Sequence, residues 1–407
     1  MGGPAGSKEA AKRCTEAVRA VGPTLIKPKN APRFVVLGGA GAIGRIVVRD
    51  LFQSSRKNVI LVADYDERAA SKLARTYGSR RVVHASVDVR QSTRVASLLS
   101  GYSVVINCTH HRLNLQVMKA ALEARVHYLD LGGLFTWTRR QLRLKPRFAE
   151  SGLTAILGMG CAPGLTNVMA AHAASQLDRV HSIRIRVGGI DFNASDGDFT
   201  FPYSAGTIIE ELTLPAWKWS RGRFVQRPPR SGWESIDFGS PVGRMWVVTT
   251  RHSEIATLPL RLQDKGLRYA DFKVGFDRLF VREVMKRLRA GWKVRDFQAL
   301  PAPRSAPNDY EVTRVIVRGD RHEILMDCLT GSNSKWHASA GDIDTACPAS
   351  IVAQMIAAGR IRKPGVWAPE DLVPADLLFQ ECRKREMEFV YRRAGDAMNS
   401  PPRRTCE

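Results

Sequence analysis

The stretch that decides the fold is RFVVLGGAGAIG, residues 33–44. A short apolar run (34–37) leads into glycines spaced GxGxxG, at Gly39, Gly41 and Gly44. This spacing between an apolar run and an amphipathic one predicts a strand, a tight turn and a helix. In such a turn, Gly39 permits the bend, Gly41 lets a pyrophosphate approach the backbone, and Gly44 lets the helix pack on the strand.

The residues around this loop predict a dinucleotide. Ala42 and Ile43 open the helix, whose free N–H groups would face the phosphates. Asp64 closes the next apolar run, about 20 residues on, where a carboxylate binds the adenosine ribose. An acid there favours NAD, because it would repel the 2′-phosphate of NADP, and Asp66 adds to that bias. Arg68 and the positive charge of the chain keep NADP possible.

Residues 33–160 alternate apolar runs with amphipathic ones. The apolar runs are 34–37, 59–63, 82–87, 104–108, 126–131 and 154–157, and the helix-like runs are 43–53, 68–77, 92–99, 113–124 and 139–151. Uniformly apolar runs are typical of strands buried on both faces. The alternation predicts an α/β chain with a Rossmann, doubly wound parallel sheet.

Ligands of such sheets bind beyond the carboxyl ends of the strands. The residues that end the later strands are therefore candidate cofactor contacts, and a loop-capping role is the alternative for each. They are Asp88, Asn107, Cys108, Thr109, Asp130, Gly132 and Gly133.

After residue 160 the pattern changes to an α+β one. A helix is expected over 165–176, and strands over 181–187, 245–250, 268–274, 311–317 and 323–328. Further helices are expected near 207–212, 279–288 and 345–358. The polar ends, 1–32 and 391–407, are expected to be a disordered leader and tail.

Composition limits the possible partners and compartments. The chain has 407 residues, 44% of them hydrophobic, and its apolar runs are too short to span a membrane. Seven scattered cysteines without a CxxC pair, and a start without an apolar signal core, favour a cytoplasmic location and no metal site. The net charge is +23, but none of the basic clusters lies in a recognisable nucleic-acid-binding module, so no specific nucleic acid is expected.

Two segments carry a family resemblance. HYLDLGG (127–133) and GMGCAPGLTN (158–167) resemble the saccharopine dehydrogenase family, and the closest likeness is to lysine 6-dehydrogenases. Segments 174–178, 187–190, 252–259, 351–361 and 365–370 also fit, so the likeness covers roughly residues 33–380.

The resemblance implies a divided architecture. The nucleotide domain would be 33–160 plus a returning segment, 341–390. A substrate and dimerisation domain, 161–340, would be inserted, and the chain would form a homodimer. The implied reaction breaks or forms a C–N bond of an amino acid or polyamine-type substrate. The leading candidate is oxidation of the lysine ε-amine to the semialdehyde, which cyclises to piperideine-6-carboxylate. The alternatives are NADPH-dependent condensation of an aldehyde with an amine, and a silent NAD(P)-binding scaffold.

Several residues could carry this chemistry. His252 and Glu254 would share a strand face if their segment is extended, giving a histidine oriented by a carboxylate. Tyr203, which is followed by Glu210 and Glu211, lies in a segment similar to a substrate loop of the family.

The 160–164 turn is the other candidate. Cys161 in this turn would line the nicotinamide site, and Asn167, one turn into the next helix, would contact the cofactor or pack within the helix.

Cationic side chains and a histidine pair complete the candidates. Arg244 or Arg251 could bind a substrate carboxylate, although surface placement is the alternative. His110 and His111 are adjacent, so in a strand their side chains would point apart and make a poor metal pair. Either could approach the cofactor from the end of the fourth strand.

Overall fold

The computed structural model describes residues 31–194, 199, 201–300 and 305–394. A seven-stranded parallel sheet has the order β15-β6-β5-β4-β1-β2-β3. Its strands are β1 (Arg33–Leu37), β2 (Val59–Asp64), β3 (Val82–Ser86), β4 (Val104–Asn107), β5 (His127–Asp130), β6 (Thr154–Ile156) and β15 (Gly365–Trp367). This order, with β1 beside both β2 and β4, confirms the predicted Rossmann sheet.

Both faces of this sheet are covered. The helices are α2 (Ala42–Ser54), α3 (Glu67–Thr76), α4 (Ser92–Leu99), α5 (Asn114–Ala124), α6 (Leu134–Gln141) and α7 (Lys145–Glu150). In β1, Phe34 and Val36 pack with residues of α2, whereas Val35 and Leu37 pack with residues of α4 and α5. The uniformly apolar strands predicted this burial on two faces.

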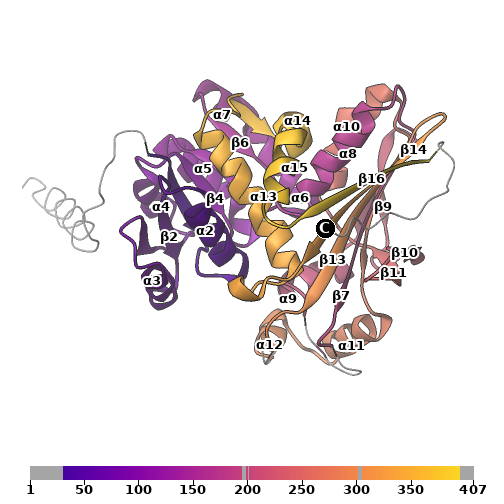
Figure 1. Cartoon of the computed structure of the whole chain (residues 1–407), viewed down its shortest axis with the longest axis horizontal. Helices are drawn as coiled ribbons and strands as arrows, with labels where there is room; N and C mark the ends of the chain where they lie inside the picture. Colours follow the sequence, from indigo (N-terminus) through magenta and orange to yellow (C-terminus); the bar gives the residue numbers. More distant parts are fainter. Residues whose placement is uncertain (1–30, 195–198, 200, 301–304, 395–407) are drawn as a thin grey trace, which may run out of the picture.

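A second, mixed sheet stands beside the first (Figure 1). Its main order is β10-β11-β12-β7-β13-β14-β16, and β8 pairs with both β12 and β9. The strands are β7 (Ser182–Asp191), β8 (Ala216–Ser220), β9 (Arg223–Arg227), β10 (Glu234–Asp237), β11 (Arg244–Thr249), β12 (Tyr269–Gly275), β13 (Asp309–Arg318), β14 (Glu323–Gly331) and β16 (Glu388–Ala394). Only β12 and β7 pair in parallel among these described strands.

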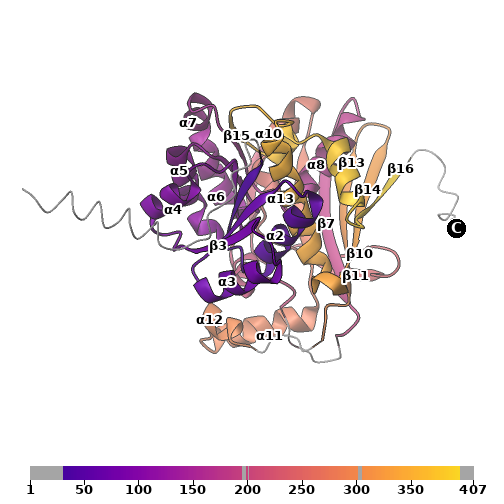
Figure 2. The same cartoon turned by 60° about the vertical axis from the view of Figure 1, so that its left-hand side comes forward.

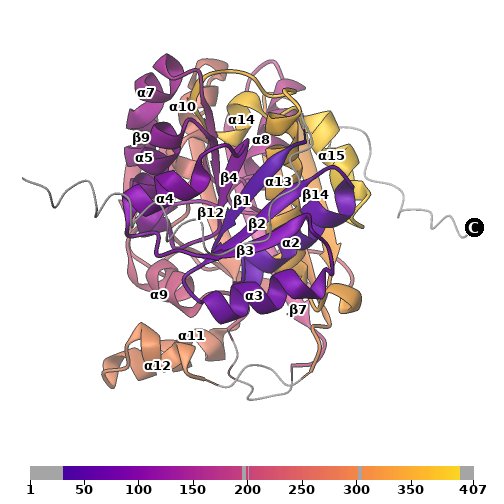
Figure 3. The ribbon, with the colours of Figure 1, turned by 90° about the vertical axis from the view of Figure 1, so that its left-hand side faces the viewer.

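The remaining helices join the sheets or cover their ends. They are α8 (Leu165–Ser175), α9 (Ala205–Thr213), α10 (Leu258–Leu262), α11 (Arg278–Arg289), α12 (Val294–Gln298), α13 (Ala340–Ala357), α14 (Pro369–Leu372) and α15 (Ala375–Arg383). Helix α13 is apolar on nearly every side and packs against α2 and β4 as well as β13 and β14. Figures 2 and 3 show α11 and α12 at the lower end of the molecule and α13 between the two sheets.

The structure corrects three predicted boundaries. The helix expected over 139–151 begins earlier, as α6, and α7 starts afresh with a proline in its first turn. Strand β16 pairs with β14, so residues 391–394 are not part of a disordered tail. For the same reason the returning segment, predicted as 341–390, ends in the second sheet. The strand is polar and lies at a sheet edge, where backbone pairing rather than an apolar pattern defines it.

The other terminal predictions, over 1–30 and 395–407, lie outside the described residues. Within the described part of the chain, no helix combines the length and apolar character needed to cross a bilayer.

Candidate active site

The glycine loop lies between β1 and α2. Gly38 has a φ of 70°, and the Gly41 N–H donates to the Gly38 carbonyl (3.1 Å), so Gly39 lies inside the tight turn that Gly38 begins. At Gly39 an added Cβ would lie 2.8 Å from the Val36 carbonyl oxygen, and at Gly44 it would lie 2.1 Å from that of Gly38. Gly41 precedes the first turn of α2, and no side chain caps it. The loop therefore packs too closely for side chains and leaves a helix N-terminus open to an anion.

Asp64 holds this loop in place at the end of β2. Its Oδ2 accepts a hydrogen bond from the Ala40 N–H (3.0 Å), and its Oδ1 accepts one from the Asp66 N–H (3.2 Å). The carboxylate is buried at the corner where Rossmann domains bind the adenosine ribose.

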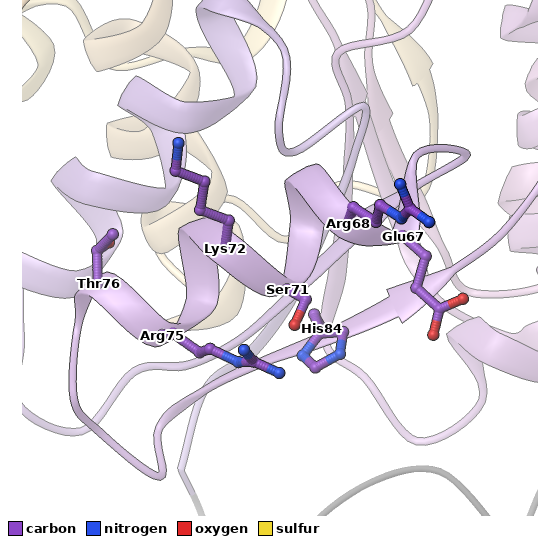
Figure 4. A pocket seen from close by; sticks show the side chains of 7 residues that line it. All are labelled: Glu67, Arg68, Ser71, Lys72, Arg75, Thr76 and His84. Atoms are coloured by element: carbon purple, nitrogen blue, oxygen red, sulfur yellow. The ribbon is translucent and has the colours of Figure 1, made fainter.

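A basic groove begins just beyond that corner (Figure 4). Arg68, Lys72 and Arg75 lie along α3 at the spacing of one helix face, above His84 of β3. The remaining lining residues are Glu67, Ser71 and Thr76.

The residues that end β4 and β5 are linked by hydrogen bonds centred on Asp130. Asp130 is fully buried, and its carboxylate accepts hydrogen bonds from the N–H groups of Gly132 (3.0 Å) and Gly158 (2.7 Å). Further donors to it come from the side chains of Asn114, Tyr128 and Gln141. The Asp130 side chain thus shapes two glycine turns at the edge of the sheet.

The other predicted contacts on this edge differ in their surroundings. The Asn107 side chain accepts hydrogen bonds from the N–H and hydroxyl of Thr109. Gly38 sits against the Cys108 carbonyl, 3.0 Å from where its Cβ would be. Asp88 forms an ion pair with Arg90 (2.7 Å), so its side chain caps a turn. Gly133 lies against Gln141, which leaves no room for a Cβ.

Asn167 stabilises the turn that precedes α8. Its Oδ1 accepts a hydrogen bond from the Gly164 N–H (3.0 Å), and its Nδ2 donates to Glu370 Oε2 (2.8 Å). Glu370 comes from α14, and burial raises the pKa of its carboxyl to about 7. The sequence did not single out Glu370, because its role depends on a contact about two hundred positions away.

Cys161 faces the second sheet. Its Sγ lies 3.1 Å from Thr313 Oγ1 and 3.8 Å from Glu311 Oε1. Burial raises the pKa of the Cys161 thiol well above its usual range, so the thiol is protonated near neutral pH. Burial also raises the pKa of Glu311 and that of Asp344, whose carboxyl groups lie within 4.8 Å of each other.

His252 is held between two carboxylates. Its Nε2 lies 3.2 Å from Glu211 Oε1, its Nδ1 lies 3.2 Å from Glu254 Oε2, and its ring stacks on Phe272 with centroids 3.7 Å apart. Burial lowers the pKa of His252, but the two carboxylates outweigh it and raise that pKa to about 10. The imidazole is therefore a fixed cation at neutral pH.

Hydrogen bonds extend this cluster in both directions. The Tyr203 hydroxyl donates to Glu211 Oε2 (2.5 Å), and the Thr166 hydroxyl donates to Glu254 Oε1 (3.1 Å). The expectation that His252 and Glu254 share a strand face was wrong, because β11 ends at Thr249 and Glu254 opens a 3-10 helix. The two side chains nevertheless meet.

The sequence singled out Glu210, whereas Glu211 is the residue that joins this cluster. The available signal was the helix period, since Glu211 shares the buried face of α9 with Ile208 and Leu212. Glu210 points instead to the nucleotide domain, where its Oε2 lies 3.1 Å from His111 Nε2 and its Oε1 meets Arg112. His111, together with Arg112, outweighs burial and lowers the pKa of Glu210 to about 2.

The predicted cationic side chains separate into two environments. Arg251 is half-buried near Glu210 and donates from Nε to the Pro215 carbonyl (2.7 Å). Arg244 is exposed and lies 3.5 Å from Asp237. Arg251 is thus the better placed of the two to meet a substrate carboxylate.

A glycine loop at a helix N-terminus, an acidic residue ending the second strand, and titratable side chains beside the same sheet define a dinucleotide-binding oxidoreductase. Sequence models of the family match both parts of the chain. The saccharopine dehydrogenase NADP binding domain matches residues 34–156, and the saccharopine dehydrogenase C-terminal domain matches residues 160–386. The chain belongs to the saccharopine dehydrogenase family, whose members are NAD(P)-dependent dehydrogenases acting on amine C–N bonds.

Individual relatives agree with this assignment. Carboxyaminopropylagmatine dehydrogenase of Synechocystis sp. is 24% identical over 386 residues, covering 84% of this chain and 94% of the relative. Carboxynorspermidine synthase of Vibrio cholerae is 25% identical over 314 residues, covering 68% and 74%. The solved saccharopine dehydrogenase (L-Glu forming) of Saccharomyces cerevisiae has the same fold, with a TM-score of 0.70 and 13% identity over 89% of this chain and all of that one.

Proposed function

We propose that this chain joins an aldehyde to a primary amine of a polyamine-type substrate, using a reduced nicotinamide dinucleotide. The amine and aldehyde lose water to give an imine, and one hydride and one proton then give the secondary amine. The observation that carries the proposal is the buried acidic cluster of the substrate domain.

Charge balance explains why this cluster suits an amine. Two carboxylates, Glu211 and Glu254, face a single imidazolium, His252, so the group keeps one net negative charge. A buried charge without a partner is strongly unfavourable. The chain as a whole carries +23, so a local excess of acid is a specific feature of the site. An ammonium group of the substrate supplies the missing partner.

The roles of the predicted catalytic residues follow from their protonation. An effective acid or base has a pKa near the working pH, whereas the pKa of His252 is about 10. We assign His252 and Glu254 to positioning Glu211 and Tyr203, which touch the amine. Cys161 keeps its proton and lines the site as a neutral thiol.

A second feature favours a substrate that also bears a carboxylate. Only the Nε of the Arg251 side chain has a hydrogen-bond acceptor among the described residues, which leaves its two terminal nitrogens for a carboxylate. The names of both curated relatives denote polyamine derivatives with a carboxyl group. A lysine substrate also has an amine and a carboxylate, so oxidation of its ε-amine is the alternative within this site.

The residues present fit a dinucleotide. The first N–H groups of α2, at Ala42 and Ile43, would hold the pyrophosphate, and Asp64 would accept hydrogen bonds from the adenosine ribose. Bound nicotinamide would supply the hydride. Asp64 and Asp66 support NAD as the preferred form, and Asp64→Ser is expected to shift the ratio of kcat/KM values towards NADP.

A substrate panel tests the proposal. Purified protein is given NADH or NADPH with pairs of small aldehydes and di- or triamines, and separately NAD with lysine or saccharopine. Condensation predicts loss of near-ultraviolet absorbance only when both an aldehyde and an amine are present. Turnover with lysine and NAD alone would show that the chain oxidises an ε-amine instead. Cofactor binding without any turnover would show that it is a NAD(P)-binding scaffold. A homodimer in the cytoplasm remains part of the proposal, with the oligomer measured by light scattering.

A further inference from the structure

His111 lies where the nucleotide domain meets the substrate domain. It begins the 3-10 helix η1 (His111–Leu113), four residues after the last residue of β4, at the carboxyl edge of the parallel sheet. Across from it stands Glu210 on α9 of the substrate domain, with His111 Nε2 and Glu210 Oε2 3.1 Å apart. The nicotinamide end of a dinucleotide is expected beside this edge of a Rossmann sheet.

The two facing atoms are buried and contact each other directly. The His111 side chain is only 9% exposed, and beyond the 3.1 Å ion-pair contact neither its Nε2 nor Glu210 Oε2 has a further polar partner among the described residues. A carboxylate oxygen can accept more than one hydrogen bond, so Glu210 Oε2 has room for a further donor from a bound substrate.

A metal ion is a poor candidate to join these groups. Donor atoms of His110, His111 and Glu210 lie within 4.8 Å of one another. However, the two imidazoles do not point apart as expected for a strand. The two rings lie against each other, with centroids 4.1 Å apart and planes tilted by 33°. His110 Nδ1 also accepts the Arg112 N–H (3.3 Å), and Arg112 takes the other oxygen of Glu210.

We propose that His111 exchanges the proton with the reacting nitrogen and oxygen of the substrate, and that Glu210 positions His111 and favours its charged form. The proposal rests on the proposed condensation. It gives the site a second imidazole, besides His252, at the junction of the two domains.

The proton balance assigns His111 two steps. The His111 imidazole takes a proton from the ammonium group of the substrate, and the free amine then adds to the aldehyde. The imidazolium returns the proton to the hydroxyl group of the carbinolamine, which leaves as water, and the protonated imine that remains accepts the hydride. Condensation thus consumes the ammonium proton and one reduced cofactor for each secondary amine and water formed.

Several charged groups set the proton affinity of His111. Glu210 on α9 favours the imidazolium. Arg112 and His110 on its own segment oppose it, as does Arg251, which follows β11 and lies near Glu210.

The test uses the full chain and a substrate pair that the wild type turns over. His111→Ala is expected to lower kcat about 10²-fold or more, leave the NADH affinity unchanged, and remove one limb of the pH profile. Added imidazole should restore part of the activity in proportion to its protonated fraction. His181→Gln, at the residue before β7, where His181 pairs with Asp320, is the matched control and should keep the wild-type profile. A His111→Ala enzyme with wild-type kcat and pH profile would overturn the proposal.

Glu210→Gln separates positioning from packing. It removes the negative charge but keeps the shape, so the pH limb assigned to His111 should move to lower pH while the fold and the NADH affinity stay the same. If the limb does not move, the assigned role of Glu210 is wrong.

If no pair is turned over, the proposed condensation fails, and His111 is tested without activity. Its ring signals, assigned with His111→Ala, are followed by NMR with NADH bound. Titration between about pH 5 and 8, shifted down in Glu210→Gln, supports an acid–base histidine for another amine reaction. A ring that does not titrate there, or one zinc ion retained per chain and lost in His111→Ala, overturns it.

Discussion

Glu370 gives the chain a pH-dependent stability that one substitution can isolate. Its side chain is 8% exposed, and Oε2 accepts the hydrogen bond from Asn167 while Oε1 has no partner among the described residues. Burial raises the pKa of the carboxyl from 4.5 to about 7. The neutral acid is therefore the form that the folded chain prefers, and Glu370→Gln mimics it.

The size and sign follow from linkage. Because the folded chain binds this proton more tightly than the unfolded chain, the stabilisation is complete below about pH 4.5 and is lost as the pH rises through about 7. The shift of the Glu370 pKa from 4.5 to about 7 corresponds to a stabilisation of about 3.4 kcal/mol, at about 1.36 kcal/mol per pKa unit. Between pH 5 and pH 8 the loss is about 2.5 kcal/mol. Gln does not titrate, so this loss disappears in the variant.

Urea unfolding at pH 5 and pH 8 measures the effect. Between these pH values, the free energy of unfolding should fall by about 2.5 kcal/mol more in the wild type than in Glu370→Gln. Glu123→Gln, on the exposed side of α5, is the matched control and should follow the wild type. Equal pH dependence in the wild type and Glu370→Gln would refute the reasoning, because Glu370 would then be ionised in the folded chain.

Three further substitutions test other parts of the molecule. Gly44→Ala puts a methyl group 2.1 Å from the Gly38 carbonyl oxygen, so NADH affinity should fall about tenfold or more in a fluorescence titration, and unchanged affinity would argue against the loop as the phosphate site. Glu211→Gln removes the net negative charge of the acidic cluster, so the KM for the amine should rise about 30- to 100-fold while the KM for NADH stays constant; a change in the NADH value alone would contradict this role. Asp50→Asn removes the more buried of the two carboxylates that pair with the Arg385 guanidinium, which lies 2.7 Å from Asp50 Oδ1, and should lower the free energy of unfolding by about 3–5 kcal/mol; a loss below about 1 kcal/mol would show that Glu381 suffices.

The parallel sheet was predictable because its strands are buried on both faces. Uniformly apolar runs and the GxGxxG spacing located β1 to β6 within one or two residues. Strand β15, the seventh strand of the parallel sheet, was not predicted, and neither were β8, β9, β10 and β16. These strands are short or polar and rely on backbone pairing with neighbours distant in sequence.

The candidate site was partly predictable. Local patterns singled out the loop, Asp64, His252 and Glu254, but not the geometry by which His252 and Glu254 meet. The choice between Glu210 and Glu211 depended on the rotation of α9, since adjacent helical residues point in different directions. The pairing of Glu370 with Asn167 joins segments far apart in the chain, and no local pattern reports it.

The most direct test of the central claim is the fate of a deuteride. The protein is incubated with 4-deuterated NADH, one aldehyde and one diamine, and the products are analysed by mass spectrometry. Reductive condensation predicts a secondary amine with one deuterium on the carbon bound to nitrogen, formed only when both substrates are present. Deuterium in an alcohol derived from the aldehyde, or in no product across the panel, would contradict the claim.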